Sequence, residues 1–464
     1  MARLIENPDH QRLVIATFCR LLNDRVVEIR RGIVVKLAEA DLSGSAASLA
    51  TERLQALCQC LLTDPDAAVR GQAAEALGIL GNENAIPALC QALEQDTNTA
   101  VRLKLVDALG NLSSGKVSPS VRVPPTHPVA RILHLSDLHF GMPEQATLWA
   151  NQLAADLCYE IQIPWLDGLI LSGDIANRAT PEDYAAAQQF LDHLLQEFPL
   201  EPEQIVIVPG NHDLNWELAR QAYSLKDRAG CEADELKPGR CIEVTADVVR
   251  VRDEEKYQQR FIHFSRFYQT IKGTAYALEY DQQYMLECWP DRKLLILGLN
   301  SAWELDWHYN ARAGIHQGAL SNALREIRRH EQYAHYLKLA VWHHPLESAG
   351  TDRVTDRGFL EQLAVAGFRF FLHGHIHKAE TSLYRYDISQ SGRKLDRICA
   401  GTFGAPTREL VPAYPWQYNL LTVEGEQLTV HTRRREAENG AWKPDARWSQ
   451  GSGKGALDFY QIEI

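Results

Sequence analysis

Five short apolar runs, each followed closely by aspartate, histidine or asparagine, restrict the fold of this chain more than any other feature of its sequence. The runs span residues 131–135, 168–171, 204–208, 337–342 and 368–372, and a sixth lies at 293–299. Apolar runs of this length, bounded by turn residues, are typical of buried strands. Helical patterns at 147–162 and 181–197 separate some of them, and the alternation of strands and helices predicts an α/β sheet.

The polar residues behind these runs form one group. Because ligands at the carboxyl ends of neighbouring strands meet at one rim of such a sheet, we expect these side chains to converge there. The group consists of Asp137, His139, Asp174, Asn211, His212, His343, His375 and His377. In the Asp-x-His and His-x-His pairs, the two-residue spacing predicts an extended segment with both side chains on one side.

The mixture of ligand types indicates which ions such a rim would bind. Carboxylate and amide oxygens suit hard cations, whereas imidazole nitrogens suit Mn, Fe, Ni or Zn. Two divalent cations about 3.5–4 Å apart can share a carboxylate and a hydroxide, clamp phosphoryl oxygens and orient the bridging hydroxide for in-line attack. The sequence therefore predicts a phosphoester hydrolase with two divalent metal ions. Manganese is the preferred assignment, and iron, zinc and nickel are the alternatives.

Five motifs carry a resemblance to a known family. They are Asp137-x-His139, Gly173-Asp174, Gly210-Asn211-His212-Asp213, His343 and Gly374-His375-x-His377. With these motifs in this order, residues 129–435 resemble the calcineurin-like metallophosphoesterases. The resemblance implies an αββα sandwich. It also implies a first metal site of Asp137, His139, Asp174 and His377, and a second of Asp174, Asn211, His343 and His375.

The resemblance assigns further roles around the metals. His212 matches the family's catalytic histidine, which is not a ligand, and Asp213 would orient it. Arg178 is a candidate phosphate contact, with a solvated arginine as the alternative. His344 follows the assigned ligand His343, so it is either the alternative ligand or a contact of the substrate.

The motifs also narrow the substrate class. Protein phosphatases of the superfamily carry G-D-x-V-D-R-G and G-N-H-E, whereas residues 173–179 here read GDIANRA and the second motif ends in Asp213. The pattern is more similar to cyclic-nucleotide phosphodiesterases and repair-type nucleases, so we expect a phosphodiesterase acting on a nucleotide or nucleic acid. A cyclic-nucleotide phosphodiesterase and a protein phosphatase are the alternatives. By analogy alone, the architecture also suits a nuclease effector of bacterial defence.

The first 112 residues repeat a helical pattern three times. The repeats begin at Asp24, Asp64 and Asp96, and an arginine follows six positions later, as Arg30, Arg70 and Arg102. Such self-similarity resembles short bacterial HEAT repeats, which stack helix pairs into an α-solenoid. We expect the aspartates to cap their helices and the arginines to pair with neighbouring acids or to form a ligand-facing row. The repeats would dock a protein partner, a substrate or another copy of the chain.

The predicted architecture is a multidomain α+β chain. Residues 1–112 form the repeat domain, residues 113–128 a linker rich in Pro and Ser, and residues 129–435 the metallophosphoesterase domain. Residues 215–285 are predicted to form an insertion over the site, and residues 436–464 a C-terminal extension.

The composition and the first residues of the sequence argue against several classes of protein. The net charge of -12 argues against a broad electrostatic grip on nucleic acid. The first nine residues lack the apolar run of a secretory signal, no apolar stretch is long enough to span a membrane, and the nine cysteines form no paired framework. We therefore expect a cytoplasmic enzyme. A repeat-based scaffold with a non-catalytic second domain is the alternative from another class.

Overall fold

The chain divides into two compact units, Met1–Thr126 and His127–Ile464. The computed structural model describes residues 8–22, 24–39, 47–80, 82–96, 98–113, 129–347, 352–385, 393–449 and 454–464. The predicted linker lies outside these residues except for Ser113, which ends the last helix of the first unit. Within the described residues, no helix combines the length and apolarity needed to cross a bilayer.

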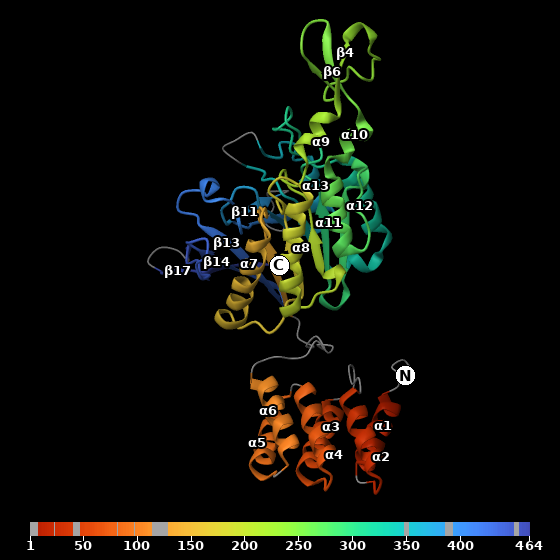
Figure 1. Ribbon diagram of the computed structural model, residues 1–464. Coiled ribbons are helices and arrows are strands. Elements are labelled where there is room, and N and C mark those ends of the chain that lie inside the picture. Colours follow the sequence, from red (N-terminus) through yellow and green to blue (C-terminus); the bar gives the residue numbers. More distant parts are fainter. Residues whose placement is uncertain are drawn as a thin grey trace. The chain divides into compact units, whose positions relative to one another are not determined.

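Helices in three successive pairs form the first unit. They are α1 (Pro8–Leu21), α2 (Val27–Glu39), α3 (Ala47–Thr63), α4 (Ala67–Leu80), α5 (Ile86–Gln95) and α6 (Thr99–Ser113). Helix α4 packs between α2 and α6, and α3 packs between α1 and α5, so that equivalent helices stack in two rows (Figure 1). The repeated leucines Leu37 and Leu77 are fully buried in the core of this unit.

The repeated aspartates do not cap their helices in the predicted way. In the second repeat the cap of α4 is Asp66, whose carboxylate accepts hydrogen bonds from the N–H groups of Ala68 and Val69 at 2.9 and 3.0 Å. Asp64 lies two residues earlier, and its carboxylate binds the guanidinium of Arg30 from the preceding repeat at 2.8 and 3.0 Å. The prediction fails because a buried arginine needs a charged partner, and Asp64 supplies it.

Two β-sheets form the centre of the second unit. The seven-stranded sheet has the order β15-β14-β13-β1-β2-β3, with β18 also paired to β14. Its strands are β1 (Ala130–Leu135), β2 (Gly168–Leu171), β3 (Ile205–Ile207), β13 (Trp416–Glu424), β14 (Gln427–Arg435), β15 (Lys443–Pro444) and β18 (Phe459–Glu463). Strands β1, β2 and β3 are parallel, so their carboxyl ends share one rim.

The second sheet has six strands in the order β11-β12-β10-β9-β8-β7. They are β7 (Tyr284–Trp289), β8 (Leu294–Leu299), β9 (Leu337–Val341), β10 (Phe368–His373), β11 (Glu380–Arg385) and β12 (Lys394–Cys399). Strands β8, β9, β10 and β12 are parallel to one another. The predicted strand runs therefore occupy the parallel parts of both sheets.

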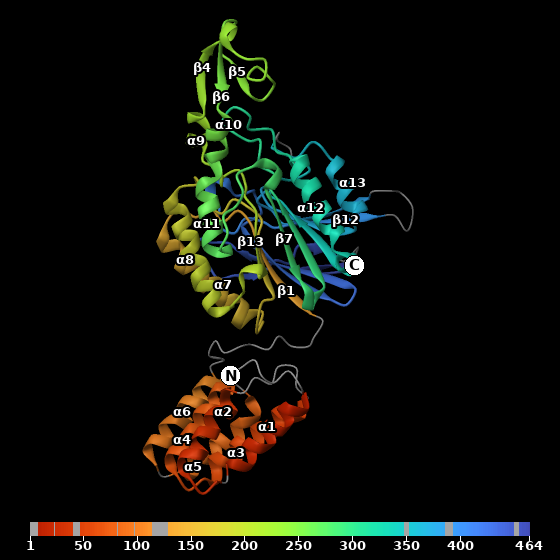
Figure 2. The same cartoon turned by 90° about the vertical axis from the view of Figure 1, so that its right-hand side faces the viewer.

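The two faces of the six-stranded sheet belong to different cores. Ile296 and Leu339 share a core with the seven-stranded sheet, whereas their neighbours in the sequence, Leu297 and Ala340, belong to a second core. This alternation follows from the two-residue period of a strand. Helices α7 (Pro143–Ala155), α8 (Pro181–Glu197) and α11 (Ile262–Lys272) contribute to the first core, and α12 (Gln317–Arg329) and α13 (Gly358–Val365) to the second. Figure 2 shows the sheets between these helices.

The predicted insertion at 215–285 is only in part an insertion. Phe264 and Phe267 of α11 are buried in the main core, so this helix belongs to the body of the unit. The remainder forms α9 (Trp216–Gln221), α10 (Glu254–Gln258) and a three-stranded sheet that projects at the top of Figure 1. The strands of that sheet are β4 (Tyr223–Asp227), β5 (Cys241–Glu243) and β6 (Val248–Arg252).

The predicted C-terminal extension is built into the second unit. Strand β18 pairs with β14 in antiparallel register, and Trp442 is buried in the main core. Two further short strands, β16 (Trp448–Ser449) and β17 (Ala456–Leu457), pair with each other. The body of the unit therefore continues past residue 435.

Candidate metal centre

The loops behind β1 and β2 run side by side and carry three of the predicted ligands. The N–H groups of Asp137 and His139 donate to the carbonyl oxygens of Gly173 and Asp174, each at 3.0 Å. The pairing of the two strands thus continues past their ends. It brings Asp137, His139 and Asp174 together at the rim.

Five of the predicted ligands have a left-handed backbone. The φ angles are 53° for Asp137, 50° for His139, 53° for Asp174, 71° for His375 and 53° for His377. The extended geometry predicted from the two-residue spacing is therefore wrong, because both members of each spaced pair are left-handed. Strained backbone of this kind clusters at functional sites.

Two motif glycines allow neighbouring loops to close on the carboxylates. A Cβ on Gly210 would lie 2.1 Å from Oδ1 of Asp174. A Cβ on Gly374 would lie 1.7 Å from Oγ of Ser136 and 2.5 Å from Oδ2 of Asp137. Since no side chain fits at these distances, the two glycines are part of the geometry of the rim.

Histidines and aspartates gather at the rim in three overlapping groups. Within each group, ligand atoms lie within 4.8 Å of one another. The groups are Asp137, His139 and His377; Asp137, Asp174 and His343; and His343, His344 and His375. The residues of these groups follow four different strands, so the fold brings together side chains that are far apart in the sequence.

Backbone carbonyls orient two of these imidazoles. Nδ1 of His343 lies 2.8 Å from the carbonyl oxygen of Ser172, and Nδ1 of His377 lies 2.9 Å from that of Glu409. Because a carbonyl only accepts, each Nδ1 carries a proton, and each Nε2 is left to face the rim. Metal-binding histidines are held in this manner in many proteins.

Several buried side-chain nitrogen and oxygen atoms at the rim have no hydrogen-bond partner among the described residues. They include both ring nitrogens of His139 and Oδ1 of Asn211. Burying such atoms without a partner costs free energy. Imidazole nitrogen and amide oxygen are both ligands of divalent transition metals. The residues present therefore fit bound metal ions.

Carboxylates shift the pKa values of two histidines. Nε2 of His343 lies 3.0 Å from Oδ2 of Asp174, and Nε2 of His377 lies 3.3 Å from Oδ1 of Asp137. Burial alone would lower the pKa of both histidines, but these carboxylates outweigh it and raise each pKa to about 9. At His139 burial prevails and lowers the pKa to about 4. Without metal, protons on the first two histidines balance the carboxylates.

Asp213 is fully buried and holds neighbouring backbone together. Its carboxylate accepts hydrogen bonds from the N–H groups of Ala176 and Gly210, at 3.0 and 2.9 Å, and from the hydroxyl of Tyr184 at 3.0 Å. Burial, together with the charge of Asp174, raises the pKa of Asp213 to about 6, although the N–H donors oppose the shift. The carboxylate thus ties the loop behind β2 to the loop behind β3.

His212 lies at the rim, but Asp213 does not orient its ring as predicted. Nδ1 of His212 lies 2.7 Å from the carbonyl oxygen of Asn177, which occupies the position that the carboxylate was expected to take. The ring lies edge-on to His139, with centroids 4.6 Å apart. The backbone N–H of His212 donates to Oδ1 of Asp174 at 2.7 Å.

The predicted residues His375 and His344 lie side by side. Nδ1 of His375 is 3.2 Å from Nε2 of His343, and its Nε2 is 2.8 Å from Oδ2 of Asp352. Nδ1 of His344 is 2.8 Å from Oγ of Ser301. His344 is only 1% exposed, so it offers almost no surface for the predicted substrate contact.

Some residues at the site escaped prediction from the sequence. Asp352 belongs to no motif, and nothing in its neighbourhood marks it as a partner of His375. The carbonyl groups that orient His343, His377 and His212 carry no sequence signal, since any residue can supply one. Arg178, which was predicted to contact phosphate, has an exposed side chain.

Comparison with known families agrees with this geometry. The profile of the calcineurin-like phosphoesterases matches residues 130–379, and that of HEAT repeats matches residues 54–122. The first match spans more than half of the 464 residues and contains the rim. The chain belongs to the calcineurin-like phosphoesterase family. Enzymes of this family hydrolyse phosphoesters with divalent metals, and the groups at the rim of this chain could hold such ions.

Individual relatives of this chain are distant. The metallophosphoesterase-like protein YydB of Bacillus subtilis is 22% identical over 258 residues, which cover 54% of this chain and 50% of the relative. The aligned part thus spans about half the length of that relative. Among solved structures, PhoD has a TM-score of 0.41 and 12% identity, with 68% of each chain covered. Vacuolar protein sorting 29 of Cryptosporidium parvum has a TM-score of 0.29 and 11% identity, covering 72% of this chain and 99% of that one.

Proposed function

We propose that the second unit is a dinuclear, metal-dependent phosphodiesterase. One observation carries this proposal. The buried ring nitrogens of His139 and the buried Oδ1 of Asn211 have no hydrogen-bond partner among the described residues, and all three atoms can bind metal. The first metal would be held by Asp137, His139, Asp174 and His377, and the second by Asp174, Asn211, His343 and His375. Asp174, in contact with both His343 and the backbone of His212, suits the role of the shared ligand.

The chemistry divides between the metals and the chain. A bound metal pair supplies Lewis acidity to the phosphoryl group and lowers the pKa of water at the site. His212, fixed through Nδ1 by the carbonyl of Asn177, presents Nε2 for proton donation to the leaving oxygen. Asp213 acts as a positioning residue, because its carboxylate binds the backbone on both sides of the site.

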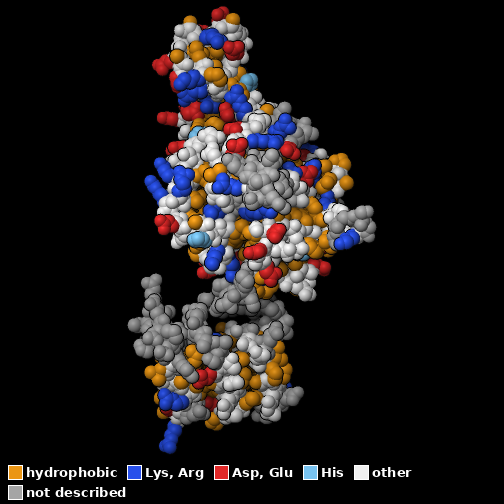
Figure 3. Space-filling view, turned by 180° about the vertical axis from the view of Figure 1, so that it is seen from behind, with side chains coloured by type: hydrophobic (Ala, Val, Ile, Leu, Met, Phe, Trp, Pro, Cys, Tyr) orange, Lys and Arg blue, Asp and Glu red, His pale blue; other side chains and the backbone are white. Residues whose placement is uncertain are grey.

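The substrate would be a phosphodiester of a nucleotide or nucleic acid. On the face shown in Figure 3, Lys and Arg side chains of the second unit are interspersed with Asp and Glu side chains. Such a mixed surface favours recognition at the rim over a broad electrostatic grip on the nucleic-acid backbone. Arg178, with its exposed side chain, is the proposed contact of a phosphate oxygen. We assign buried His344 to the support of His375 rather than to the substrate.

The two units would be separate domains joined by the segment 113–128. The stacked rows of helices support a HEAT-like α-solenoid, and the two sheets between helices support an αββα sandwich. HEAT repeats are protein-interaction modules, so the first unit would dock a partner that positions or controls the hydrolase. A defence nuclease is one setting that suits this architecture.

A substrate panel with the manganese-loaded protein tests the proposal. It contains bis-p-nitrophenyl phosphate, p-nitrophenyl phosphate, cyclic nucleotides, and single- and double-stranded DNA and RNA. We expect hydrolysis of diesters and about two metal ions per chain by elemental analysis. Asp174→Asn should lose both ions and all turnover, and Asn211→Ala should lose one ion. Asp192→Asn, which changes an exposed carboxylate on α8, is the matched control.

Two results would contradict the proposal. Hydrolysis of the monoester alone would overturn the preference for diesters. A single bound ion in the wild-type protein, with Asn211→Ala unchanged in metal content, would overturn the second metal site.

A further inference from the structure

Arginine–aspartate pairs join successive repeats of the first unit. Arg30 donates to both carboxylate oxygens of Asp64 at 2.8 and 3.0 Å, and Arg70 donates to both of those of Asp96 at 2.7 and 3.1 Å. Each arginine also donates to the main-chain carbonyl of the aspartate in its own repeat. Every interface between repeats thus uses the same bidentate pair, with the arginine on one side and the aspartate on the other.

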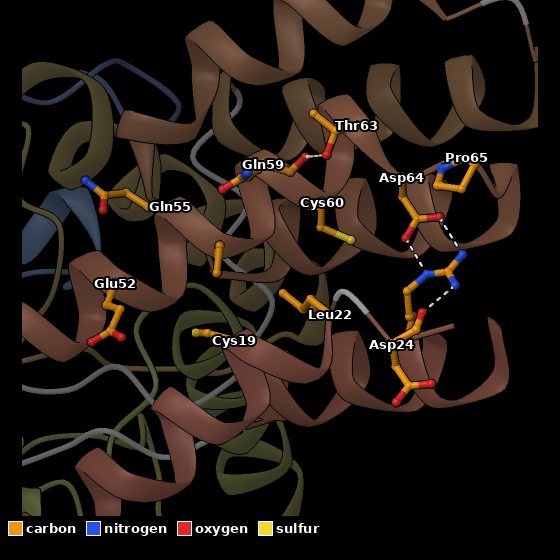
Figure 4. Close-up of a pocket in the computed structure, with 12 residues that line it drawn as sticks. Cys19, Leu22, Asp24, Glu52, Gln55, Gln59, Cys60, Thr63, Asp64 and Pro65 are labelled. Atoms are coloured by element: carbon orange, nitrogen blue, oxygen red, sulfur yellow. Dashed lines mark hydrogen bonds and ion pairs between the residues drawn. The ribbon is translucent and has the colours of Figure 1, made fainter. Parts of the chain in front are cut away.

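The row of repeated arginine–aspartate pairs has an arginine at one end and an aspartate at the other, so its two ends carry opposite charges. Arg102, the third arginine, is exposed, and its side chain forms no ion pair within the described part of the chain. The carboxylate of Asp24, the first aspartate, accepts a hydrogen bond from the N–H of Val26 at 2.8 Å and forms no ion pair with another described residue. In Figure 4 this carboxylate points away from the ion pair beside it. Each end group is equivalent to one that is paired inside the series.

The apolar residue beside Arg102 is exposed at the same end. Val106, four residues after Arg102, is 54% exposed. Its equivalents in the other repeats, Val34 and Ala74, are fully buried. In the first two repeats, the repeat that follows covers this position. In the last repeat, the residue at this position is exposed.

The opposite end shows the same pattern. Ile29, five residues after Asp24, is 42% exposed, whereas its equivalents Val69 and Val101 are 0% and 1% exposed. Repeat arrays are ordinarily closed by terminal repeats with a polar outer face, because stacking otherwise continues. Here both ends keep the apolar and charged residues of an inner interface.

We propose that the first unit binds a second copy of itself head to tail. Arg102 of one copy would form the bidentate pair with Asp24 of the next, and Val106 would be covered beside Ile29. The interface is heterologous, since the two surfaces differ, so association continues into rings or filaments rather than stopping at a dimer. This inference concerns the repeats and is independent of the proposed phosphodiesterase activity.

Charge reversal at the two ends tests the interface on the full-length protein. Sedimentation velocity and light scattering should give a wild-type mass that rises with concentration above the 52.3 kDa of one chain. Arg102→Asp and Asp24→Arg should each be monomeric, because like charges then meet at every interface. An equimolar mixture of these two variants should associate again, since each end of one variant then faces the opposite charge on the other. Arg228→Asp, at the residue that directly follows β4 in the second unit, is the charge-matched control and should associate like the wild type.

Restoration by mixing separates the proposal from a folding defect. A misfolded variant would stay monomeric or aggregate in the mixture, and circular dichroism of each variant checks its helical content. A wild-type protein that stays monomeric at high micromolar concentration overturns the proposal. So does a mixture that stays monomeric while both variants are folded.

Discussion

Replacing Asp213 by asparagine distinguishes a structural role of this residue from a direct catalytic one. The carboxylate accepts hydrogen bonds from the N–H groups of Ala176 and Gly210 and from the hydroxyl of Tyr184. An asparagine keeps one acceptor oxygen and replaces the other with an NH2 group. In the better orientation the oxygen faces Ala176 and Tyr184, and the NH2 group then faces the N–H of Gly210.

The cost follows from that mismatch. A hydrogen bond to a charged group contributes about 1.5–3 kcal/mol, and a buried donor left without an acceptor costs about 1–3 kcal/mol. We therefore expect Asp213→Asn to lower the free energy of unfolding by about 2.5–6 kcal/mol, the sum of these two contributions. Tyr184→Phe removes one hydroxyl donor and leaves the backbone donors Ile175, Ala176 and Gly210 in place. It should cost about 1.5–3 kcal/mol, the contribution of one hydrogen bond to a charged group.

Urea unfolding followed by tryptophan fluorescence measures this difference. All ten tryptophans lie in the second unit, so the signal reports that unit alone. The measurement is made with chelator, because bound metal would add its own stabilisation. If Asp213→Asn unfolds at the wild-type urea concentration and still loses turnover, the carboxylate acts in the reaction and the structural argument is wrong.

Three further predictions concern the metals. Without metal, the pKa values of His343 and His377 are raised to about 9. Metal binding at pH 7 should therefore release up to two protons, and the affinity for metal should increase as the pH rises towards 9. Calorimetry in buffers of different ionisation enthalpy measures the proton release. His212→Gln should keep both metal ions in elemental analysis but lower kcat by about 100-fold or more, as expected for a general acid. Gly210→Ala should lose metal although every ligand is intact, because the new Cβ would lie 2.1 Å from Oδ1 of Asp174. A metal content equal to that of the wild type would show that the loop can move aside.

Much of the fold follows from local patterns in the sequence. The run predicted at 168–171 is strand β2, and the helix predicted at 181–197 is α8 with the same bounds. That helix begins with a capping box between Thr180 and Asp183, a local signal that does not depend on the rest of the chain. The helix predicted at 147–162 instead begins at Pro143 and gives way to a π-helical turn at Asp156–Glu160.

The motifs also located the site, but not the contacts that shape it. Spacing alone could not reveal that Asp213 binds backbone rather than a histidine, because that depends on how the loops behind β2 and β3 meet. The polar stretch around α11 was assigned to an insertion, although Phe264 and Phe267 fill the main core. Their burial depends on packing against the rest of the unit, which a local pattern does not contain.

The backbone at the rim suggests why aspartate and histidine recur in these motifs. A left-handed residue other than glycine costs about 1–3 kcal/mol, so five such residues represent a substantial strain. Aspartate, asparagine and histidine adopt this conformation more readily than most residues. They are also ligands of divalent metals. The same residue types therefore meet both demands, since they bend the chain back into the rim and offer the donor atoms there. A substitution that keeps the backbone but removes the negative charge of a ligand, such as aspartate to asparagine, accordingly tests the chemistry of the site with the least disturbance of its fold.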